Sequence, residues 1–330
     1  MTLRRMEVDR DARLETVMID GVFPDDFHPT TNFPTEVRIA GAWISVARPE
    51  MDVGIRVRDG KAESCPMHQA RKGDAIVVGD DGVRVTTPVV ETDETFRFMR
   101  SSVSSERPKA KLVAGVAAAI REAHGRGEKV LLVGGPAIVH GGAGPKLEAL
   151  IHAGAFDLVF AGNALAAHDI EAAMFGTSLG VELETGVSVP HGHRHHLRAI
   201  NRVRGHGSIA AAVKAGAVPR GIFHACVTKG VPFVLAGSIR DDGPLPDVVT
   251  DVVAAQDAMR NALDGVTVAV LVATLLHSVA VGNMLPASVR TFAVDASSDA
   301  VIKLVDRGTH QASGIVTDST YFLGELLATL

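Results

Sequence analysis

The chain has 330 residues, of which 46% are hydrophobic and 22% are charged, and its formal net charge is −5. This composition is ordinary for a folded protein with a large core and excludes global disorder. No basic stripe with interleaved aromatic residues occurs, so we expect no nucleic-acid partner.

Three features of the sequence bear on the cellular compartment. Cys65 and Cys226 lie far apart and form no C-x-x-C pair, which fits a reducing compartment. The charged N-terminus lacks the apolar core of a secretory signal peptide. The run between Asp264 and Arg290 has no Asp, Glu, Lys or Arg, but its second half contains polar residues. A buried strand leading into a polar loop explains this run better than a membrane span, so we predict a cytoplasmic protein.

Residues 1–100 predict a small, antiparallel, β-rich domain. After an N-terminal stretch without a clear period, short apolar runs alternate with turn signals. Asp-Gly dipeptides stand at positions 59–60 and 81–82. Apolar runs at 75–78 and 83–85 flank the second dipeptide, as in a β-hairpin.

Residues 101–330 predict an α/β domain that follows a serine-rich linker at 101–108. Short apolar runs, each leading to Gly, Asn, Ser or Asp, predict strands at 130–133, 158–161, 233–236, 266–276 and 292–294. Periodic segments predict helices at 110–126, 197–203, 247–263 and 300–307. This alternation predicts a parallel sheet with helices on both faces.

The predicted strand ends are candidate ligand sites, because ligands of open parallel sheets bind outside the carboxyl ends of the strands. The glycine-rich segment 134–144 lies between a strand and a helix that begins near Pro145. Such glycines let the backbone approach a pyrophosphate, although a flexible turn is the alternative. Asp295 ends an apolar strand. An acid at this place commonly binds the adenosine ribose and disfavours a 2′-phosphate, which indicates NAD rather than NADP. A helix N-cap is an equally open interpretation.

Several polar residues near these ends are candidates for chemistry. Asn163 is placed to orient a nicotinamide or a substrate, and Asp169, beside His168, is a candidate general base or a loop anchor. His277 lies in an apolar run, where a core histidine and a catalytic one are both open. Residues 191–196 contain four histidines that one helix cannot bring to one ion. No carboxylate or cysteine ligand is suitably spaced, so we predict no metal site.

Charged residues elsewhere are candidates for substrate binding. Arg240 suits the clamping of an amino-acid carboxylate, and Asp241 and Asp242 suit an ammonium group, with a solvated turn as the alternative. Asp25 and Asp26 in the N-terminal motif have the same two interpretations.

Seven segments resemble one family: residues 134–140, AGNALAAHDIEAAMFGTSLG at 161–180, HLRAIN at 196–201, GVPFVLAGSIR at 230–240, and residues 241–260, 276–286 and 314–318. They are similar to the archaeal and cyanobacterial NAD-dependent ornithine cyclodeaminases, a LOR/SDH-associated family sometimes fused to an arginine dihydrolase. The likeness runs from about Gly21 to the C-terminus. Three features depart from it: the segment before the Phe-Pro-Asp-Asp-Phe motif is short, Gly141 replaces a usual Thr, and Asp295-Ala296-Ser297 replaces Asp-Ile-Asn-Pro.

The resemblance implies a nucleotide-binding domain like that of deoxyhypusine synthase and a tightly bound NAD that serves as a recycled hydride carrier. The implied reaction converts L-ornithine to L-proline and ammonia, within arginine and ornithine metabolism and proline biosynthesis. A homo-oligomer is implied as well. The alternatives are an NAD-dependent amino-acid dehydrogenase, a cyclodeaminase of a related diamino acid, and a non-catalytic NAD-binding sensor.

The candidate site residues divide into three groups. Those expected to act in catalysis are Asp169, His277, Asp241 and Arg240. Those expected to bind the amino-acid substrate are Asp25, Asp26, Thr31 and Asn32. Those expected to bind NAD are Gly134, Gly135, Gly142, Ala143, Gly144, Gly162, Asn163, Ala164, Gly237, Ser238, Ile239, Asn283 and Asp295.

Overall fold

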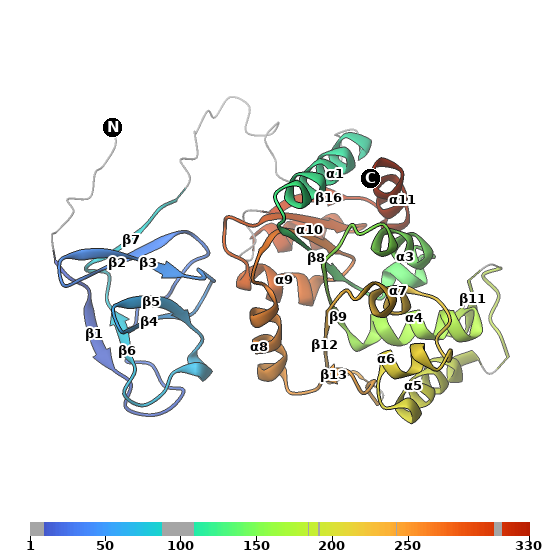
Figure 1. Cartoon of the computed structure of the whole chain (residues 1–330), viewed down its shortest axis with the longest axis horizontal. Coiled ribbons are helices and arrows are strands. Elements are labelled where there is room, and N and C mark those ends of the chain that lie inside the picture. Colours follow the sequence, from blue (N-terminus) through green and yellow to red (C-terminus); the bar gives the residue numbers. More distant parts are fainter. Residues whose placement is uncertain (1–9, 88–108, 184, 191, 242, 307–311) are drawn as a thin grey trace. The chain divides into compact units, whose positions relative to one another are not determined.

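The computed structural model describes residues 10–87, 109–183, 185–190, 192–241, 243–306 and 312–330. The predicted domain boundary at residue 100 and the linker at 101–108 lie outside these ranges, as does Asp242. The chain divides into two compact units (Figure 1). Residues 282–288 cluster with the smaller, N-terminal unit, which the sequence did not predict.

The smaller unit is built on a seven-stranded sheet with the order β1-β6-β4-β5-β3-β2-β7. Its strands are β1 (Arg13–Thr16), β2 (Thr35–Ile39), β3 (Ala42–Ala47), β4 (Gly54–Arg58), β5 (Lys61–Cys65), β6 (Ala75–Val78) and β7 (Val83–Val85), with a short 3-10 helix at Met67–Gln69. Val37, Ile55 and Val77 are fully buried at its core. The β-rich fold predicted for this part of the chain is therefore present.

Two details of this sheet differ from the prediction. The prediction of a hairpin at residues 81–82 is wrong, because β6 and β7 do not pair with each other: β7 pairs with β2, whereas β6 pairs with β1 and β4. A Cβ at Gly82 would lie 2.2 Å from the backbone nitrogen of Ala12, so this turn packs against the N-terminal segment. The sheet is also not wholly antiparallel, since β3 and β5 pair in parallel. The Asp59-Gly60 hairpin between β4 and β5 does form.

The larger unit contains a second seven-stranded sheet and most of the helices. Its sheet strands are β8 (Lys129–Gly134), β9 (Leu158–Gly162), β12 (Phe233–Ala236), β13 (Val248–Val249), β14 (Val266–Val272), β15 (Arg290–Asp295) and β16 (Ala312–Val316). Its helices are α1 (Lys109–Gly125), α2 (Ala137–His140), α3 (Gly144–His152), α4 (Asn163–Phe175), α5 (His195–His206), α6 (Ile209–Lys214), α7 (Ile222–Lys229), α8 (Val252–Ala262), α9 (Leu275–Met284), α10 (Ser298–Asp306) and α11 (Ser319–Thr329). A small ribbon of β10 (Thr177–Ser178) and β11 (Val181–Glu182) follows α4, and a 3-10 turn at Gly192–Arg194 precedes α5.

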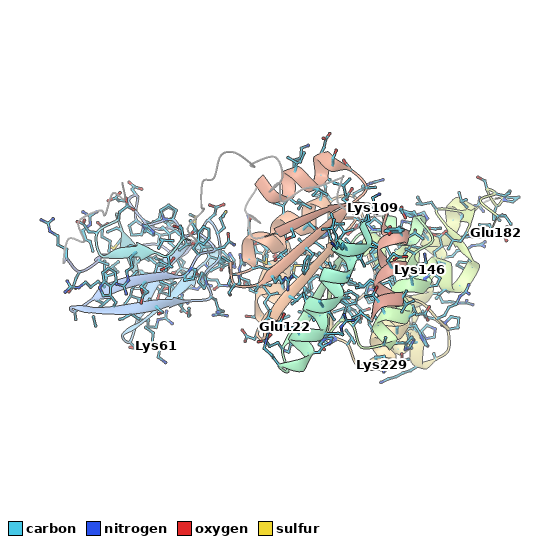
Figure 2. All side chains as sticks on the ribbon, turned by 90° about the horizontal axis from the view of Figure 1, so that it is seen from above. Lys61, Lys109, Glu122, Lys146, Glu182 and Lys229 are labelled. Atoms are coloured by element: carbon cyan, nitrogen blue, oxygen red, sulfur yellow. The ribbon has the colours of Figure 1, made fainter. Side chains whose placement is uncertain are left out.

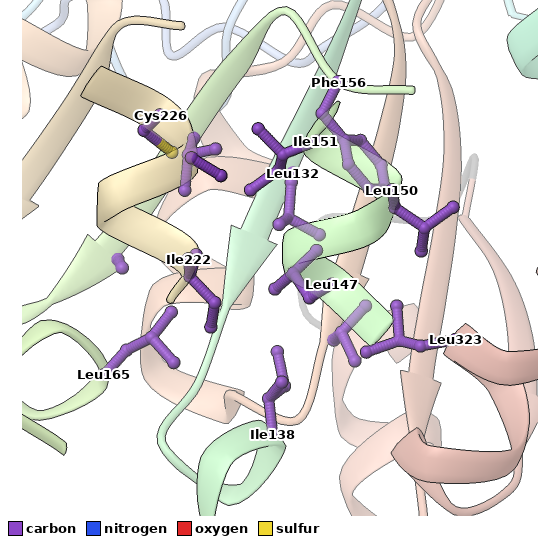
Figure 3. Packing of buried hydrophobic residues seen from close by; sticks show 14 of the residues in the cluster. Leu132, Ile138, Leu147, Leu150, Ile151, Phe156, Leu165, Ile222, Cys226 and Leu323 are labelled. Carbon is purple, nitrogen blue, oxygen red and sulfur yellow. The ribbon is translucent and has the colours of Figure 1, made fainter. Parts of the chain in front are cut away.

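The strand order is β13-β12-β9-β8-β14-β15-β16, and every pair in this sheet is parallel. Helices cover both faces, as predicted (Figure 1). On β15, Phe292 and Val294 pack into the core that α1, α3 and α11 share, whereas Ala293 packs with Leu304 of α10. Figure 3 shows this main core, where the side chain of Leu132 lies between those of α3 and α7. Charged side chains such as Glu122 and Lys229 project outward from the helices (Figure 2).

Three elements of this unit differ from the prediction. The apolar run from 266 is a strand only to Val272, and α9 then replaces the expected polar loop. The predicted helix at 247–263 begins later, because β13 occupies its first residues. Strand β16 was not predicted, since its Ser and Gly interrupt the apolar run. No helix among the described residues is long and apolar enough to cross a membrane.

Candidate active site

The carboxyl ends of five neighbouring strands meet at one edge of the larger sheet. The register pairs Gly134 at the end of β8 with Ala161 of β9 and Val272 of β14, and it pairs Gly162 with Ala236 of β12. Asp295 ends β15 on the same edge. The structure thus brings together strand-end residues that the sequence predicted to share a site.

His277, near the start of α9, occupies the space directly over the end of β9. A Cβ built on Gly162 would lie 2.7 Å from Cε1 of His277, so glycine at 162 makes room for the imidazole. Burial lowers the pKa of His277, and the nearby carboxylate of Asp241 opposes that shift in part. The ring is therefore neutral at pH 7 and able to accept a proton, a condition for a general base.

The glycine-rich segment 134–144 serves two different purposes. A Cβ at Gly135 would lie 1.8 Å from the carbonyl oxygen of Ala273, so this glycine is required by the protein's own backbone. Gly142, with φ +76°, and Gly144 have no atom within 4 Å of such a Cβ. The second half of the segment is therefore open to a ligand, as a pyrophosphate site requires.

The helices that follow this segment and β9 begin without side-chain caps. Among the described residues, no side chain accepts a hydrogen bond from the first amides of α3, whose N-cap is Ala143, or of α4, whose N-cap is Gly162. Helices α8 and α11, by contrast, are capped by Asp251 and Asp318. Free amides and the positive end of the helix dipole suit an anionic group, so these helix starts fit the phosphates of a dinucleotide.

Asp169 is engaged by the protein rather than left free for substrate. Its two carboxylate oxygens accept hydrogen bonds from the backbone nitrogens of Ile222 and Phe223 at the start of α7, at 2.9 and 3.0 Å. Burial raises the pKa of Asp169 to about 7 despite these two bonds. This geometry favours the loop-anchor interpretation over that of a general base.

The turn after β12 is held by Asp241. Its carboxylate accepts hydrogen bonds from the backbone nitrogen and the hydroxyl of Ser238, at 2.8 and 3.2 Å, so it anchors the turn. Ile239 and Arg240 are exposed. The Arg240 side chain makes no hydrogen bond or ion pair within the described part of the chain, which leaves it free for a carboxylate.

Two more predicted cofactor residues have partners inside the protein. Asn163 is buried, and its side-chain oxygen accepts a hydrogen bond from the Leu245 backbone nitrogen. Asp295 accepts one from the backbone nitrogen of Ser297, which favours a local turn, and its second carboxylate oxygen has no hydrogen-bond partner among the described residues. Asn163 is thus engaged within the fold through its side-chain oxygen, whereas Asp295 is half-buried and remains a candidate for the ribose.

The predicted substrate residues lie in the smaller unit. Asp25 is exposed, and Asp26 forms an exposed ion pair with Arg13. Thr31 accepts a hydrogen bond from the backbone of Phe33.

Asn32 joins two segments of the smaller unit that are distant in sequence. It is buried, and its amide donates to the carbonyls of Gly282, Asn283 and Leu285. Asn32 therefore holds the segment 282–288. The Asn283 side-chain oxygen is buried and has no hydrogen-bond partner among the described residues.

The sequence did not predict a buried polar network centred on Glu171 of α4. Glu171 is fully buried and accepts hydrogen bonds from Nδ1 of His168, the hydroxyl of Thr177 and the backbone nitrogens of Leu179 and Gly180. Burial alone would raise the pKa of Glu171, but these hydrogen bonds, led by that of His168, outweigh it and lower the pKa. Glu171 is therefore ionised at neutral pH.

Other histidines extend this network to α2 and α5. The His140 and His168 rings lie 4.6 Å apart, and Nδ1 of His140 is 2.6 Å from the hydroxyl of Ser178. His195 pairs with the hydroxyl of Thr177. Burial and the neighbouring His168 lower the pKa of His140. The network fixes the turn at 177–180 beside α2, the helix that follows the glycine-rich end of β8.

A pocket of about 420 Å³ is lined in part by α4. Its lining includes Gly142 and Gly144, the carboxylate residues Glu148, Asp169 and Glu182, and Arg220. The open half of the glycine-rich segment thus faces a cavity large enough for part of a cofactor or an amino acid.

The fold and this edge define a Rossmann-type α/β protein with a glycine-rich ligand site at its strand ends. The family models divide the chain accordingly. The C-terminal Rossmann-fold region of ArgZ-like arginine dihydrolases matches residues 114–326, and the first region of the same C-terminal part matches residues 34–113. The chain belongs to this ArgZ-like C-terminal family, in agreement with the resemblance found in the sequence.

Named relatives and solved structures agree with this assignment. The ornithine cyclodeaminase of Archaeoglobus fulgidus is 48% identical over 95% of this chain and 77% of its own length. A LOR/SDH protein from Methanococcus maripaludis S2 has a TM-score of 0.93 at 44% identity, over 97% of this chain and 98% of its own. AgrE, crystallised as a ternary complex with ornithine and NAD+, has a TM-score of 0.66 at 42% identity, over 98% of this chain and 46% of its own.

Proposed function

We propose that this chain is an ornithine cyclodeaminase that converts L-ornithine to L-proline and ammonia with NAD as a recycled cofactor. Relatives named ornithine cyclodeaminase align over nearly the whole chain, and AgrE binds ornithine and NAD+ together. The structural observation that carries the proposal is the neutral imidazole of His277 over Gly162, at the strand edge where a dinucleotide would bind.

NAD, when bound, supplies a reversible two-electron store, so that the oxidation of the amino carbon and the later reduction of the ring need no outside oxidant or reductant. The residues that would hold it are Gly134, Gly142, Ala143, Gly144, Gly162, Ala164, Gly237, Ile239 and Asp295. Among these, Asp295 favours NAD over NADP, because its carboxylate would repel a 2′-phosphate.

The protein's own side chains supply binding and proton transfer. Ornithine carries two ammonium groups at neutral pH, and an amine must lose a proton before its carbon can be oxidised or its nitrogen can attack. The neutral His277 imidazole accepts such a proton at Nε2 in the tautomer whose Nδ1–H donates to the hydroxyl of Thr274, at 3.4 Å. Arg240 binds the substrate carboxylate, and Asp241 shapes the turn that carries Arg240.

The test is to incubate the purified full chain with L-ornithine and a catalytic amount of NAD, and to measure proline, ammonia and NADH absorbance. We expect proline and ammonia in equal amounts and no lasting rise in NADH. Turnover of lysine or diaminobutyrate instead of ornithine would change the substrate. Net NADH formation would indicate a dehydrogenase, and tight NAD binding without turnover of any diamino acid would indicate a sensor.

His277→Gln tests the role of the imidazole. We expect kcat to fall by roughly 10²–10⁴-fold while NAD still binds, as for the loss of a general base. In the native protein, kcat should rise with pH with an apparent pKa below the ordinary histidine value of 6.5, because burial lowers the pKa of His277. Wild-type kcat in the variant would eliminate His277 as the base.

We further propose that the protein acts in the cytoplasm as a homo-oligomer. Cys65 and Cys226 are both free and buried, which fits a reducing compartment. The oligomer rests on the family resemblance, and light scattering of the purified chain tests it directly.

A further inference from the structure

Three metal-ligating side chains converge between α3 and α7. Glu148 and His152 lie one helical turn apart on α3, and His224 lies on α7. One ligand atom from each of the three lies within 4.8 Å of the other two. Spacing of i and i+4 on a helix places two side chains on one face, as in known metal-binding helices.

The helices that carry these residues are held firmly together. Leu147, Leu150 and Ile151 of α3 and Ile222 and Cys226 of α7 are fully buried in the main core, and Figure 3 shows them in this core on either side of Leu132. The backbone positions of the three ligands are therefore fixed by packing. Preorganised ligands bind a metal at a smaller entropic cost than flexible ones.

Among the residues that the structure describes, no competing partner engages the three side chains. Within the described part of the chain, neither Glu148 nor His152 forms a hydrogen bond or ion pair, and Nδ1 of His224 is buried without a hydrogen-bond partner. A buried ring nitrogen left unpaired is costly, and such groups in native proteins call for an explanation. A bound cation at this point would satisfy Glu148 and one imidazole nitrogen of each histidine.

The chemistry of the ligand set selects the class of ion. Two imidazoles and one carboxylate suit Zn²⁺ and its neighbours in the first transition series, with bonds of about 2.0–2.2 Å. Ligand atoms within 4.8 Å of one another reach such bond lengths after small side-chain rotations. The Asp169 and Glu182 carboxylates line the same pocket as Glu148 and add to the attraction for a cation, although Arg220 on the same wall opposes it.

We propose that Glu148, His152 and His224 bind one divalent transition-metal ion, which joins α3 to α7. Three protein ligands leave at least one coordination position open, and one of the ligands, Glu148, also lines the pocket of about 420 Å³. The proposed site uses none of the residues 191–196, at which the sequence analysis predicted no metal site. It does not depend on the proposed cyclodeaminase activity.

The test is Zn²⁺ binding to the tag-free full chain after treatment with EDTA, followed by titration calorimetry. We expect one Zn²⁺ per chain, and a Co²⁺ complex with the visible absorption of a low-coordinate site. His152 is exposed, so His152→Ala should leave the fold intact and weaken Zn²⁺ binding at least tenfold. Glu148→Gln should weaken it similarly. His206→Ala, which removes another exposed histidine, is the matched control and should bind as the native chain does.

Two outcomes would overturn the proposal. The first is the absence of stoichiometric binding to the native chain. The second is native affinity in His152→Ala, above all if binding disappears when His191 and His193 are replaced, because the ion would then belong to the histidine-rich segment. A rise in melting temperature with Zn²⁺ that is seen in the native chain and in His206→Ala, but not in His152→Ala, would confirm that the ion binds to the folded state.

Discussion

The buried network around Glu171 permits a quantitative prediction. Oε1 of Glu171 accepts hydrogen bonds from the Thr177 hydroxyl and the Gly180 nitrogen, and Oε2 accepts them from His168 and the Leu179 nitrogen. Glu171→Gln keeps the shape but turns one of the two oxygens into an amide donor. The hydroxyl of Thr177 and the ring of His168 can reverse their roles, but a backbone amide cannot.

The magnitude follows from this asymmetry. In either orientation of the glutamine, one backbone N–H, that of Leu179 or Gly180, faces a donor and stays unpaired. A buried unpaired group costs about 1–3 kcal/mol, and the loss of charge weakens the remaining hydrogen bonds by about 1 kcal/mol more. We therefore expect Glu171→Gln to lower the free energy of unfolding of the larger unit by about 2–4 kcal/mol.

Differential scanning calorimetry measures this effect. For a unit of this size, about 2–4 kcal/mol corresponds to a fall of roughly 4–16 °C in the melting temperature. Glu182→Gln, at an exposed position in the following ribbon, should change stability by less than about 0.5 kcal/mol. Hydrogen exchange should show lost protection at the amides of Leu179 and Gly180. A melting temperature within about 2 °C of native, with protection retained at both amides, would refute the reasoning.

Three further predictions concern residues with defined backbone partners. Gly135→Ala should destabilise the fold by about 3 kcal/mol or more, because the added methyl group clashes with the backbone of Ala273. Gly144→Ala should melt at the same temperature as the native chain but bind NAD more weakly, and calorimetry measures both effects. Asp169 has a pKa of about 7 in the folded state and about 3.9 when unfolded, so its burial lowers stability by about 4 kcal/mol in total as pH rises from about 4 to 7. Asp169→Asn should therefore make the melting temperature depend less on pH across that range, as melting curves recorded at several pH values would show. Asn32→Asp would set a carboxylate against three carbonyl oxygens and should destabilise the smaller unit by more than about 2 kcal/mol, with faster proteolysis within residues 282–288.

The sequence predicted the architecture of the larger unit because its strands are short, buried and apolar and end at Gly or Asp. Once such strands are parallel, their carboxyl ends share one edge whatever the details of the loops. The run from 266 shows where this reasoning failed, because periodicity cannot distinguish a buried strand from a buried helix within a continuous apolar stretch. Strand β14 therefore ended earlier than predicted, and α9 was missed.

The candidate site was predicted less completely than the fold. Asp169 and His277 were equal candidates for proton transfer, and only the structure separates them: both oxygens of Asp169 bind α7, whereas His277 lies over Gly162. Glu171 was missed because a helical glutamate is usually solvated. One signal was available, since α4 is apolar on nearly all sides, and a helix of that kind is buried together with its polar residues.

The departure at Gly141 from the family pattern has a structural counterpart. Where the family resemblance implies Thr, a Cβ on Gly141 would lie 3.1 Å from the carbonyl oxygen of Ala137 and 3.4 Å from the hydroxyl of Thr320 on α11. The Thr320 hydroxyl donates to the carbonyl of Gly141 at 2.8 Å. A hydroxyl from α11 thus stands close to the place that the missing threonine would fill, and it fixes the turn between α2 and α3. The loss of the side chain at 141 therefore leaves this turn anchored, and Gly142 and Gly144 remain open beside it.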